Sequence, residues 1–256
     1  ANGVALGTVL SETTAFLLSL YYVKRHSRKN FNIPIFSSTV LKNIFNISAF
    51  KVLFSLNRDI FIRTMCLTMT LASFVVLGTR FGTEVLAANA VLMNLQNLTS
   101  YGLDGFAQAA EVLVGKEIGR KSKKNLRAAV IISSKWAIIT AVAMTLFYYI
   151  FGEMIINLLT NIETIRNISS NYLTWIIILP LLSIWSFQLD GIFIGATAGS
   201  SMRNGMIISV ISYILAIFIL IPLWGNHGLW AAYSIFMIMR AITLFYKYPE
   251  IEKRAT

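Results

Sequence analysis

The chain has 256 residues, of which 56% are hydrophobic and 13% are charged, and its mean hydropathy is +0.68. A soluble domain of this length does not need so apolar a composition for its core, so the sequence indicates an integral membrane protein. The formal net charge of +11 does not point to nucleic acid, because Lys and Arg cluster at the ends of apolar segments, where membrane topology places them.

Seven apolar segments are long enough to cross a bilayer, which takes about 20 residues of helix. In chain order they cover residues 3–23, 58–79, 84–114, 127–150, 170–198, 203–223 and 227–246. Between the first two, residues 38–57 place apolar and polar side chains on opposite faces, which is typical of a helix lying in the membrane interface. The expected fold class is therefore all-α integral membrane, with about seven transmembrane helices.

The chain divides into four expected parts. They are a first transmembrane helix at residues 1–23, a basic linker with the interfacial helix at 24–57, a six-helix bundle at 58–246 and a tail at 247–256. Cations are concentrated after the first and third spans, at residues 24–29 and 116–124, whereas the alternating connections carry few. The positive-inside rule then predicts that these basic connections and the C-terminal tail are cytoplasmic.

A weak internal repeat bears on the organisation of the whole protein. Residues 2–21 resemble residues 226–246, since each has a glycine, a pair of small residues and an apolar run ending in tyrosine. Parallel repeats of this kind occur in transporters built from two equivalent halves. The repeat predicts that the first span closes a preceding N-terminal bundle that is missing from this sequence. Chance similarity between two apolar helices is the alternative.

The third span carries a polar stripe. Its members recur at intervals of three or four residues and are Asn94, Asn97, Tyr101, Asp104, Gln108 and Glu111. Helical geometry places them on one face, which would be costly against lipid, so we expect this face to line a water-filled cavity. A seam of interhelical hydrogen bonds is the alternative, although such seams rarely need two carboxylates.

A second intramembrane acid, Asp190, lies in the fifth span beyond Pro180. Asp104 and Asp190 are framed alike, as Leu-Asp-Gly, and a carboxylate near the middle of a bilayer usually marks the path of an ion or substrate. Asp190 is expected to ligate a cation or to bind and release a proton, and a permanent salt bridge to an arginine is the alternative. Arg63 in the second span is such an arginine, unless its side chain extends to the cytoplasmic surface.

Three segments resemble the DinF-like branch of the multidrug and toxic compound extrusion (MATE) family. They are Gly105-Phe106-Ala107-Gln108-Ala109-Ala110-Glu111 with the glycines that follow, Leu189-Asp190-Gly191-Ile192 through Asn204, and Asn57-Arg58-Asp59-Ile60-Phe61-Ile62-Arg63-Thr64. The resemblance implies two bundles of six helices, of which this chain holds the sixth helix to the twelfth. It also implies location in the cell membrane and export of cationic or amphipathic compounds in exchange for H⁺ or Na⁺, with no other cofactor.

The resemblance leaves the coupling ion open. Asp190 matches a tenth-helix acid implicated in cation binding in the NorM-like branch, but the seventh-helix glutamate that accompanies it there has no counterpart here. DinF-like proteins are associated with protons and with an acid on a first helix that this sequence lacks.

We therefore expect antiport by alternating access, with the third-span stripe, Asp190 and Arg63 as the cation- and substrate-binding residues. A flippase for lipid-linked sugars shares the architecture by resemblance and would need a more cationic cavity. An intramembrane enzyme is less favoured, because the chain has two histidines, one cysteine and no metal-ligand spacing such as HExxH.

Overall fold

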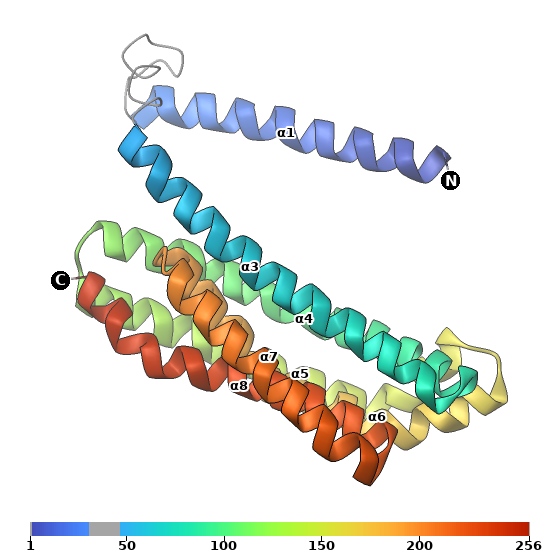
Figure 1. The fold of residues 1–256 in the computed structure, drawn as a ribbon. Helices are drawn as coiled ribbons and strands as arrows, with labels where there is room; N and C mark the ends of the chain where they lie inside the picture. The colour runs from blue at the N-terminus through green and yellow to red at the C-terminus, as the bar shows by residue number, and fades with distance from the viewer. Residues whose placement is uncertain (1, 31–46, 256) are drawn as a thin grey trace. The chain divides into compact units, whose positions relative to one another are not determined.

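The structure, a computed structural model, describes residues 2–30 and 47–255, and these residues form helices and short turns without any strand. The helices are α1 (Asn2–Asn30), α3 (Ile47–Gly78), the 3-10 turn η1 (Thr79–Phe81), α4 (Thr83–Gly119), α5 (Lys123–Leu159), α6 (Glu163–Gly195), α7 (Gly199–Trp224) and α8 (Asn226–Arg254) (Figure 1). The predicted all-α fold with seven long helices is confirmed.

Six of these seven helices are long and apolar enough to span a membrane, namely α1, α3, α5, α6, α7 and α8. The remaining helix, α4, is as long as α5, but Asn and Gln residues recur through its apolar part and lower its hydropathy. Its polar stripe thus sets α4 apart from the other helices.

The helices extend beyond the apolar segments from which they were predicted. α1 continues to Asn30, and residues 47–57 form the start of α3 rather than part of a separate interfacial helix. Residues 31–46, where the rest of that interfacial helix was expected, lie outside the described part of the chain. Lys and Arg are good helix formers, so helical hydrogen bonding continues where hydrophobicity stops. For the same reason α8 takes in most of the predicted tail.

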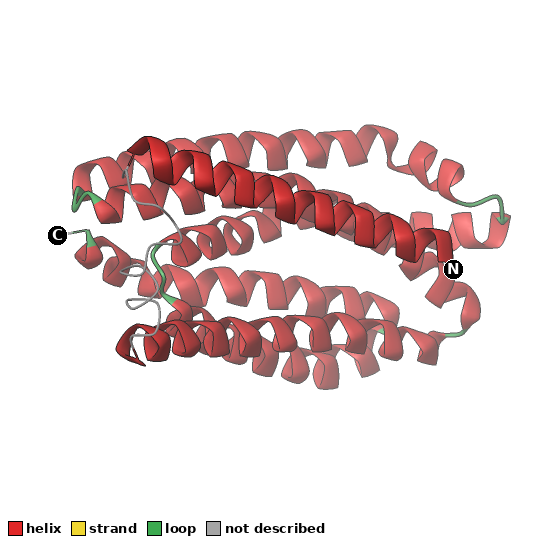
Figure 2. Ribbon diagram, turned by 90° about the horizontal axis from the view of Figure 1, so that it is seen from above, coloured by secondary structure: helices red, strands yellow, loops and turns green. Residues whose placement is uncertain are grey.

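The chain has two compact units, one up to Ser55 and one from Leu56 onward. In the first unit, α1 exposes every side chain that the structure describes. The second unit holds the rest of α3 and the helices α4 to α8, joined by short turns (Figure 2). One of these turns requires glycine: Gly225, at φ 54° and ψ −127°, reverses the chain between α7 and α8.

In the second unit, α6 packs directly against α4, and glycines allow the two backbones to approach closely. A Cβ atom added to Gly191 would lie 2.1 Å from the carbonyl oxygen of Ala107, and one at Gly195 would lie 2.3 Å from that of Glu111. Helices in membranes associate largely through such small-residue contacts, because burial from lipid offers little driving force. Glycine at these positions of α6 therefore determines how closely α4 lies to it.

The glycines of the two Leu-Asp-Gly segments are not equivalent. Gly191 is buried against α4, whereas Gly105 is exposed and a Cβ there would meet nothing within 4 Å. The similar sequences therefore occupy different environments.

α3 is connected to the bundle mainly through long side chains. Phe74 lies edge-on to Trp230 with ring centroids 4.9 Å apart, and the Ser73 hydroxyl donates to the Tyr213 hydroxyl at 3.2 Å. Where α4 and α8 begin, the side-chain amides of Asn89 and Asn226 donate to each other at 2.7 and 3.0 Å. These buried contacts join the helices at the end of the bundle that contains the α7–α8 turn.

Gly191→Ala is expected to destabilise the protein by about 1–3 kcal/mol, because the added methyl group would overlap the α4 backbone. Gly105→Ala is the matched control, since its methyl group would have open space. Thermal unfolding of the purified variants in detergent measures both effects. Equal midpoints for the two variants would show that the α4–α6 contact is not as close as described.

Candidate functional site

A cavity of about 430 Å³ lies between α3, α4, α6 and α8. We call it the polar cavity. Its polar lining residues are Arg63, Asn97, Ser100, Asp104, Gln108, Glu111, Asp190, Tyr233 and Arg240. Both Leu-Asp-Gly carboxylates and the second-span arginine therefore line one cavity.

Four of the six stripe residues on α4 line the polar cavity, and Asn94 and Tyr101 do not. Tyr101 is 75% exposed and Asn94 is also exposed. At about 100° per residue, these two lie at one edge of the stripe, turned away from Asp104 and Glu111. The expectation that all six share one cavity is therefore not met, because a stripe with steps of three and four spreads around the helix.

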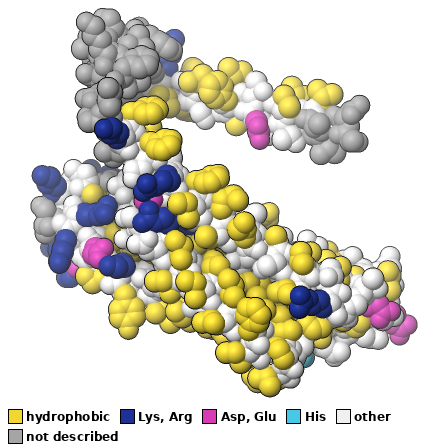
Figure 3. All heavy atoms as spheres, in the orientation of Figure 1, with side chains coloured by type: hydrophobic (Ala, Val, Ile, Leu, Met, Phe, Trp, Pro, Cys, Tyr) yellow, Lys and Arg dark blue, Asp and Glu magenta, His cyan; other side chains and the backbone are white. Residues whose placement is uncertain are grey.

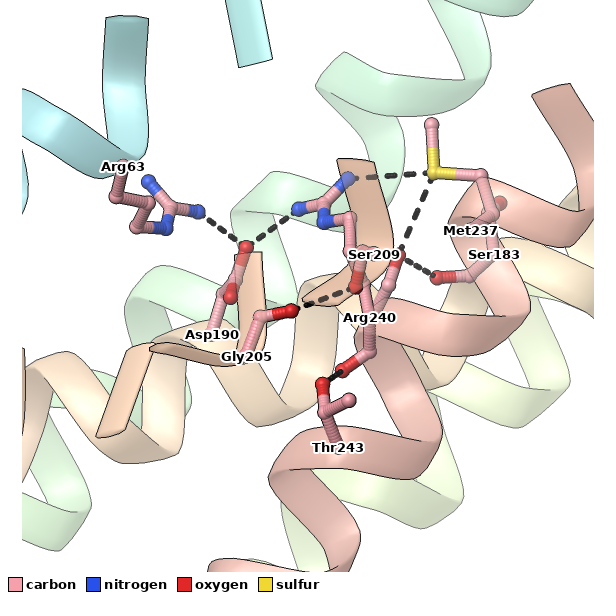
Figure 4. Close-up of polar contacts among 9 residues, drawn as sticks. Arg63, Ser183, Asp190, Gly205, Ser209, Met237, Arg240 and Thr243 are labelled. Carbon is pink, nitrogen blue, oxygen red and sulfur yellow. Dashed lines mark hydrogen bonds and ion pairs between the residues drawn. The ribbon is translucent and has the colours of Figure 1, made fainter. Parts of the chain in front are cut away.

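Two arginines hold Asp190. Arg63 on α3 and Arg240 on α8 each donate a hydrogen bond from Nη2 to the same oxygen, Oδ2, and the Arg240 contact measures 2.5 Å (Figure 4). Asp190 is 7% exposed and Arg240 is 3% exposed. Of the alternatives left open by the sequence, the structure has the salt bridge to Arg63 rather than an arginine extended to the surface.

Arg240 was missed in the sequence analysis, although an arginine within the apolar segment 227–246 is itself a signal of function or pairing. Its guanidinium carbon lies 5.6 Å from the ring centroids of both Phe187 and Phe236, and its Nη1 donates to the sulfur of Met237 at 3.2 Å. Aromatic faces attract a cation most strongly where water is excluded. These contacts stabilise Arg240 in the orientation that reaches Asp190.

Asp190 satisfies neither all the hydrogen-bond donors nor the full charge of the two arginines. The Nε atoms of Arg63 and Arg240 are buried and have no hydrogen-bond partner among the described residues. One carboxylate also leaves a formal charge of +1 on the three side chains. The compensating charge in the same cavity comes from Asp104 and Glu111 on α4, which bring the formal sum of the five groups to −1.

Asp104 differs from Asp190 in having no ion pair. It is partly exposed, it lines the polar cavity, and within residues 2–30 and 47–255 it takes part in none of the hydrogen bonds or salt bridges found. The same holds for Glu111 in the described chain. The arrangement can therefore offer two open carboxylates to a cation, next to a third that is already neutralised.

Basic side chains gather at one end of the second unit, where α4 meets α5 and the chain ends (Figure 3). Arg203 donates to Asp59 at 2.5 Å there, and Arg127 binds Glu252 through two hydrogen bonds of 2.6 and 2.7 Å. The carboxylates at this end are paired, so the excess charge is positive.

A family model described as MatE matches residues 60–221, which is more than half of the chain. The chain belongs to the MatE family. The match includes α4, α5 and α6 completely, and it contains every lining residue of the polar cavity except those contributed by α8. The family resemblance drawn from the Asp-Gly segments is thereby confirmed.

The MatE chain is 37% identical over 243 residues to DNA damage-inducible protein F of Escherichia coli strain K12. The alignment covers 95% of this chain and 52% of that protein, so the chain spans about half the length of that relative.

Two solved structures share the fold of this MatE chain. A MOP superfamily transporter from Pyrococcus furiosus, whose description attributes to it a binding pocket of reversed polarity, matches with a TM-score of 0.69, 16% identity, and coverage of 77% of this chain and 44% of its own. An inward-facing multidrug resistance MATE family transporter matches with a TM-score of 0.63, 19% identity, and coverage of 85% and 49%. At these identities the likeness shows the fold alone.

Asp190→Asn is expected to destabilise the MatE chain by about 3–5 kcal/mol, because it leaves two buried arginines without their shared carboxylate. Glu250→Gln is the control, since it breaks an exposed Lys247–Glu250 pair of 2.7 Å and should leave the unfolding midpoint unchanged. Thermal unfolding of both variants measures the difference. A midpoint for Asp190→Asn equal to that of the parent would exclude a stabilising role for the arginine pair.

Proposed function

We propose that this chain lines one side of the substrate pathway of a membrane efflux transporter, which exports cationic or amphipathic small molecules in exchange for inward H⁺ or Na⁺. Membership in the MatE family supports transport rather than enzymatic chemistry. The single observation that carries the substrate class is the presence of two unpaired carboxylates, Asp104 and Glu111, in the polar cavity.

In this mechanism the coupling cation and the substrate compete for the open carboxylates of α4. A cationic substrate binds Asp104 in its ionised form, and protonation or Na⁺ binding at the same group releases it. One cation moving inward yields about 2.3 kcal/mol per 100 mV of membrane potential. That energy supports roughly fifty-fold accumulation of a neutral substrate, at about 1.4 kcal/mol per factor of ten.

Asp190 has a different role in this proposal from the one that its position in the sequence led us to expect. Its charge is already balanced by Arg63 and Arg240, so it is a poorer ligand for an added cation than Asp104. We assign to it the positioning of α3 and α8 against α6. Motion of α3 during alternating access would then require the Arg63 contact to break and re-form.

A flippase for lipid-linked sugars is the second candidate, and the observation in its favour is the pair of arginines in the cavity, since a diphosphate needs cationic partners. Both arginines are bound to Asp190, and the cavity charge sums to −1, which favours a cationic substrate. An aspartyl enzyme is less favoured still. Its two carboxyls would have to share a proton, whereas Asp190 is already held by the two arginines.

Asp104→Asn is expected to reduce efflux of a fluorescent cationic dye at least ten-fold, because the amide can neither bind a proton nor neutralise a cation. The measurement uses the intact protein in proteoliposomes with an imposed proton or sodium gradient. Glu84→Gln is the control on the same helix, since Glu84 is exposed in the first turn of α4 and lies outside the cavity lining.

Normal dye efflux by Asp104→Asn would reject the role of Asp104. Gradient-dependent movement of a lipid-linked oligosaccharide without dye efflux would favour the flippase instead.

The end of the bundle with the basic side chains is proposed to face the cytoplasm, in the plasma membrane. A fluorescent protein fused after Thr256 is then expected to fluoresce, and alkaline phosphatase inserted at Gly225 in the α7–α8 turn is expected to be active outside. The opposite pattern in the two fusions would reverse the orientation.

A further inference from the structure

A second cavity, of about 470 Å³, lies between α5, α6 and α8. We call it the outer groove. It uses a different face of α6 from the polar cavity: Trp185, Leu189 and Ile192 line the outer groove, whereas Asp190 and Ile194 line the polar cavity. The outer groove therefore opens on the side of α6 that faces away from the proposed substrate pathway.

The lining of the outer groove changes along the helices, from charged side chains at the basic end of the bundle to apolar side chains further in. Arg127 and Glu252 line it at the basic end of the bundle, and Ile138 and Trp185 line it further in. The hydrogen bond from Gln188 to Ser133, at 2.7 Å, places this part of α6 level with the first third of α5, beyond its basic start. The order matches that of a phospholipid, with its polar head at the membrane surface and its acyl chains inside.

One cation lies well inside this groove. Lys135 is twelve residues beyond Lys123 at the start of α5, which corresponds to about 18 Å along the helix. Its side chain is exposed, and in the described part of the chain no carboxylate or other group forms an ion pair or hydrogen bond with it. An unpaired cation at this depth is costly in lipid, so it calls for an anionic partner or for extension toward the surface.

A second group in the groove also lacks a partner. The hydroxyl of Ser134, next to Lys135, is buried at 7% exposure and makes no hydrogen bond with any described residue. Buried polar atoms rarely remain unsatisfied, and rotation of the Ser134 side chain toward the groove that it lines would give this hydroxyl a partner there.

The charge at the mouth of the groove is also positive. Glu252 is bound by both Arg127 and Lys123, with contacts of 2.6 and 3.2 Å, which leaves one excess cation there. The charged residues of the lining itself, Arg127, Lys135 and Glu252, sum to one net positive charge, and the lining has no free carboxylate. Basic pockets between transmembrane helices at this level typically bind anionic lipid head groups.

We propose that the outer groove is a binding site for an anionic phospholipid from the leaflet at the basic end of the bundle. Its phosphate contacts the Lys135 ammonium group and the Ser134 hydroxyl, and one acyl chain lies along Ile138 and Trp185. The bound lipid neutralises Lys135 and fills the space between α5 and α8. This site is separate from the polar cavity and does not depend on the transport proposal.

The test uses the intact protein in nanodiscs and the fluorescence of Trp185, which is 40% exposed. Brominated phosphatidylglycerol and brominated phosphatidylcholine are compared as quenchers, and the Trp185 contribution is obtained by subtracting the signal of Trp185→Phe. We expect about five-fold stronger association of the anionic lipid, because one lipid–lysine contact contributes about 1 kcal/mol.

Lys135→Gln is expected to reduce this preference to about one, and Lys135→Arg is expected to retain it. Lys124→Gln is the matched control, because Lys124 is an exposed cation of the same helix outside the groove lining. Equal quenching by the two lipids in the parent protein would overturn the proposal. A preference that survives Lys135→Gln, or that falls equally in Lys124→Gln, would also overturn it.

Discussion

The polar cavity depends on one carboxylate shared by two arginines. Asp190 on α6 holds Arg63 from α3 and Arg240 from α8, and all three groups are largely removed from water. Charges in such a place are tolerated only when each has a partner, because the cost of desolvation is several kcal/mol per ion. The pairing therefore links three helices that are distant in the sequence. It leaves one positive charge unbalanced, and the acids of α4 in the same cavity can balance it.

Close backbone contact between α4 and α6 supports that arrangement. Gly191 follows Asp190 directly, so the residue that carries the charge is next to the residue that permits the helices to touch. A larger side chain there would push α4 away and widen the cavity in which Asp104 and Asp190 lie together. The Asp-Gly pair on α6 thus combines a packing requirement with an electrostatic one.

The two sides of α6 serve different environments. One side lines the polar cavity with Asp190, and the other lines the outer groove with Trp185 and Leu189. Neither cavity could form on an isolated helix, since each takes its walls from at least two neighbours. This division matches what the proposed substrate pathway and the proposed lipid site would each require of α6.

The fold class, the seven long helices, the family and the acids within apolar segments could all be predicted from the sequence. These features depend on hydropathy, residue spacing and local motifs, which act over a few turns of one helix. The sequence named Arg63 as one candidate partner for Asp190 and left extension of Arg63 to the surface as the alternative.

Which of those groups meet could not be predicted, because it depends on how the helices pack. Arg240 joins Asp190 from 50 residues further along the chain, and Tyr101 is left outside the polar cavity although its spacing fits the stripe. The two Leu-Asp-Gly segments look equivalent in the sequence, yet one carboxylate is paired and the other is open. The reason is that the rotation of each helix and the distance to its neighbours follow from packing among residues far apart in the chain, which no local pattern encodes.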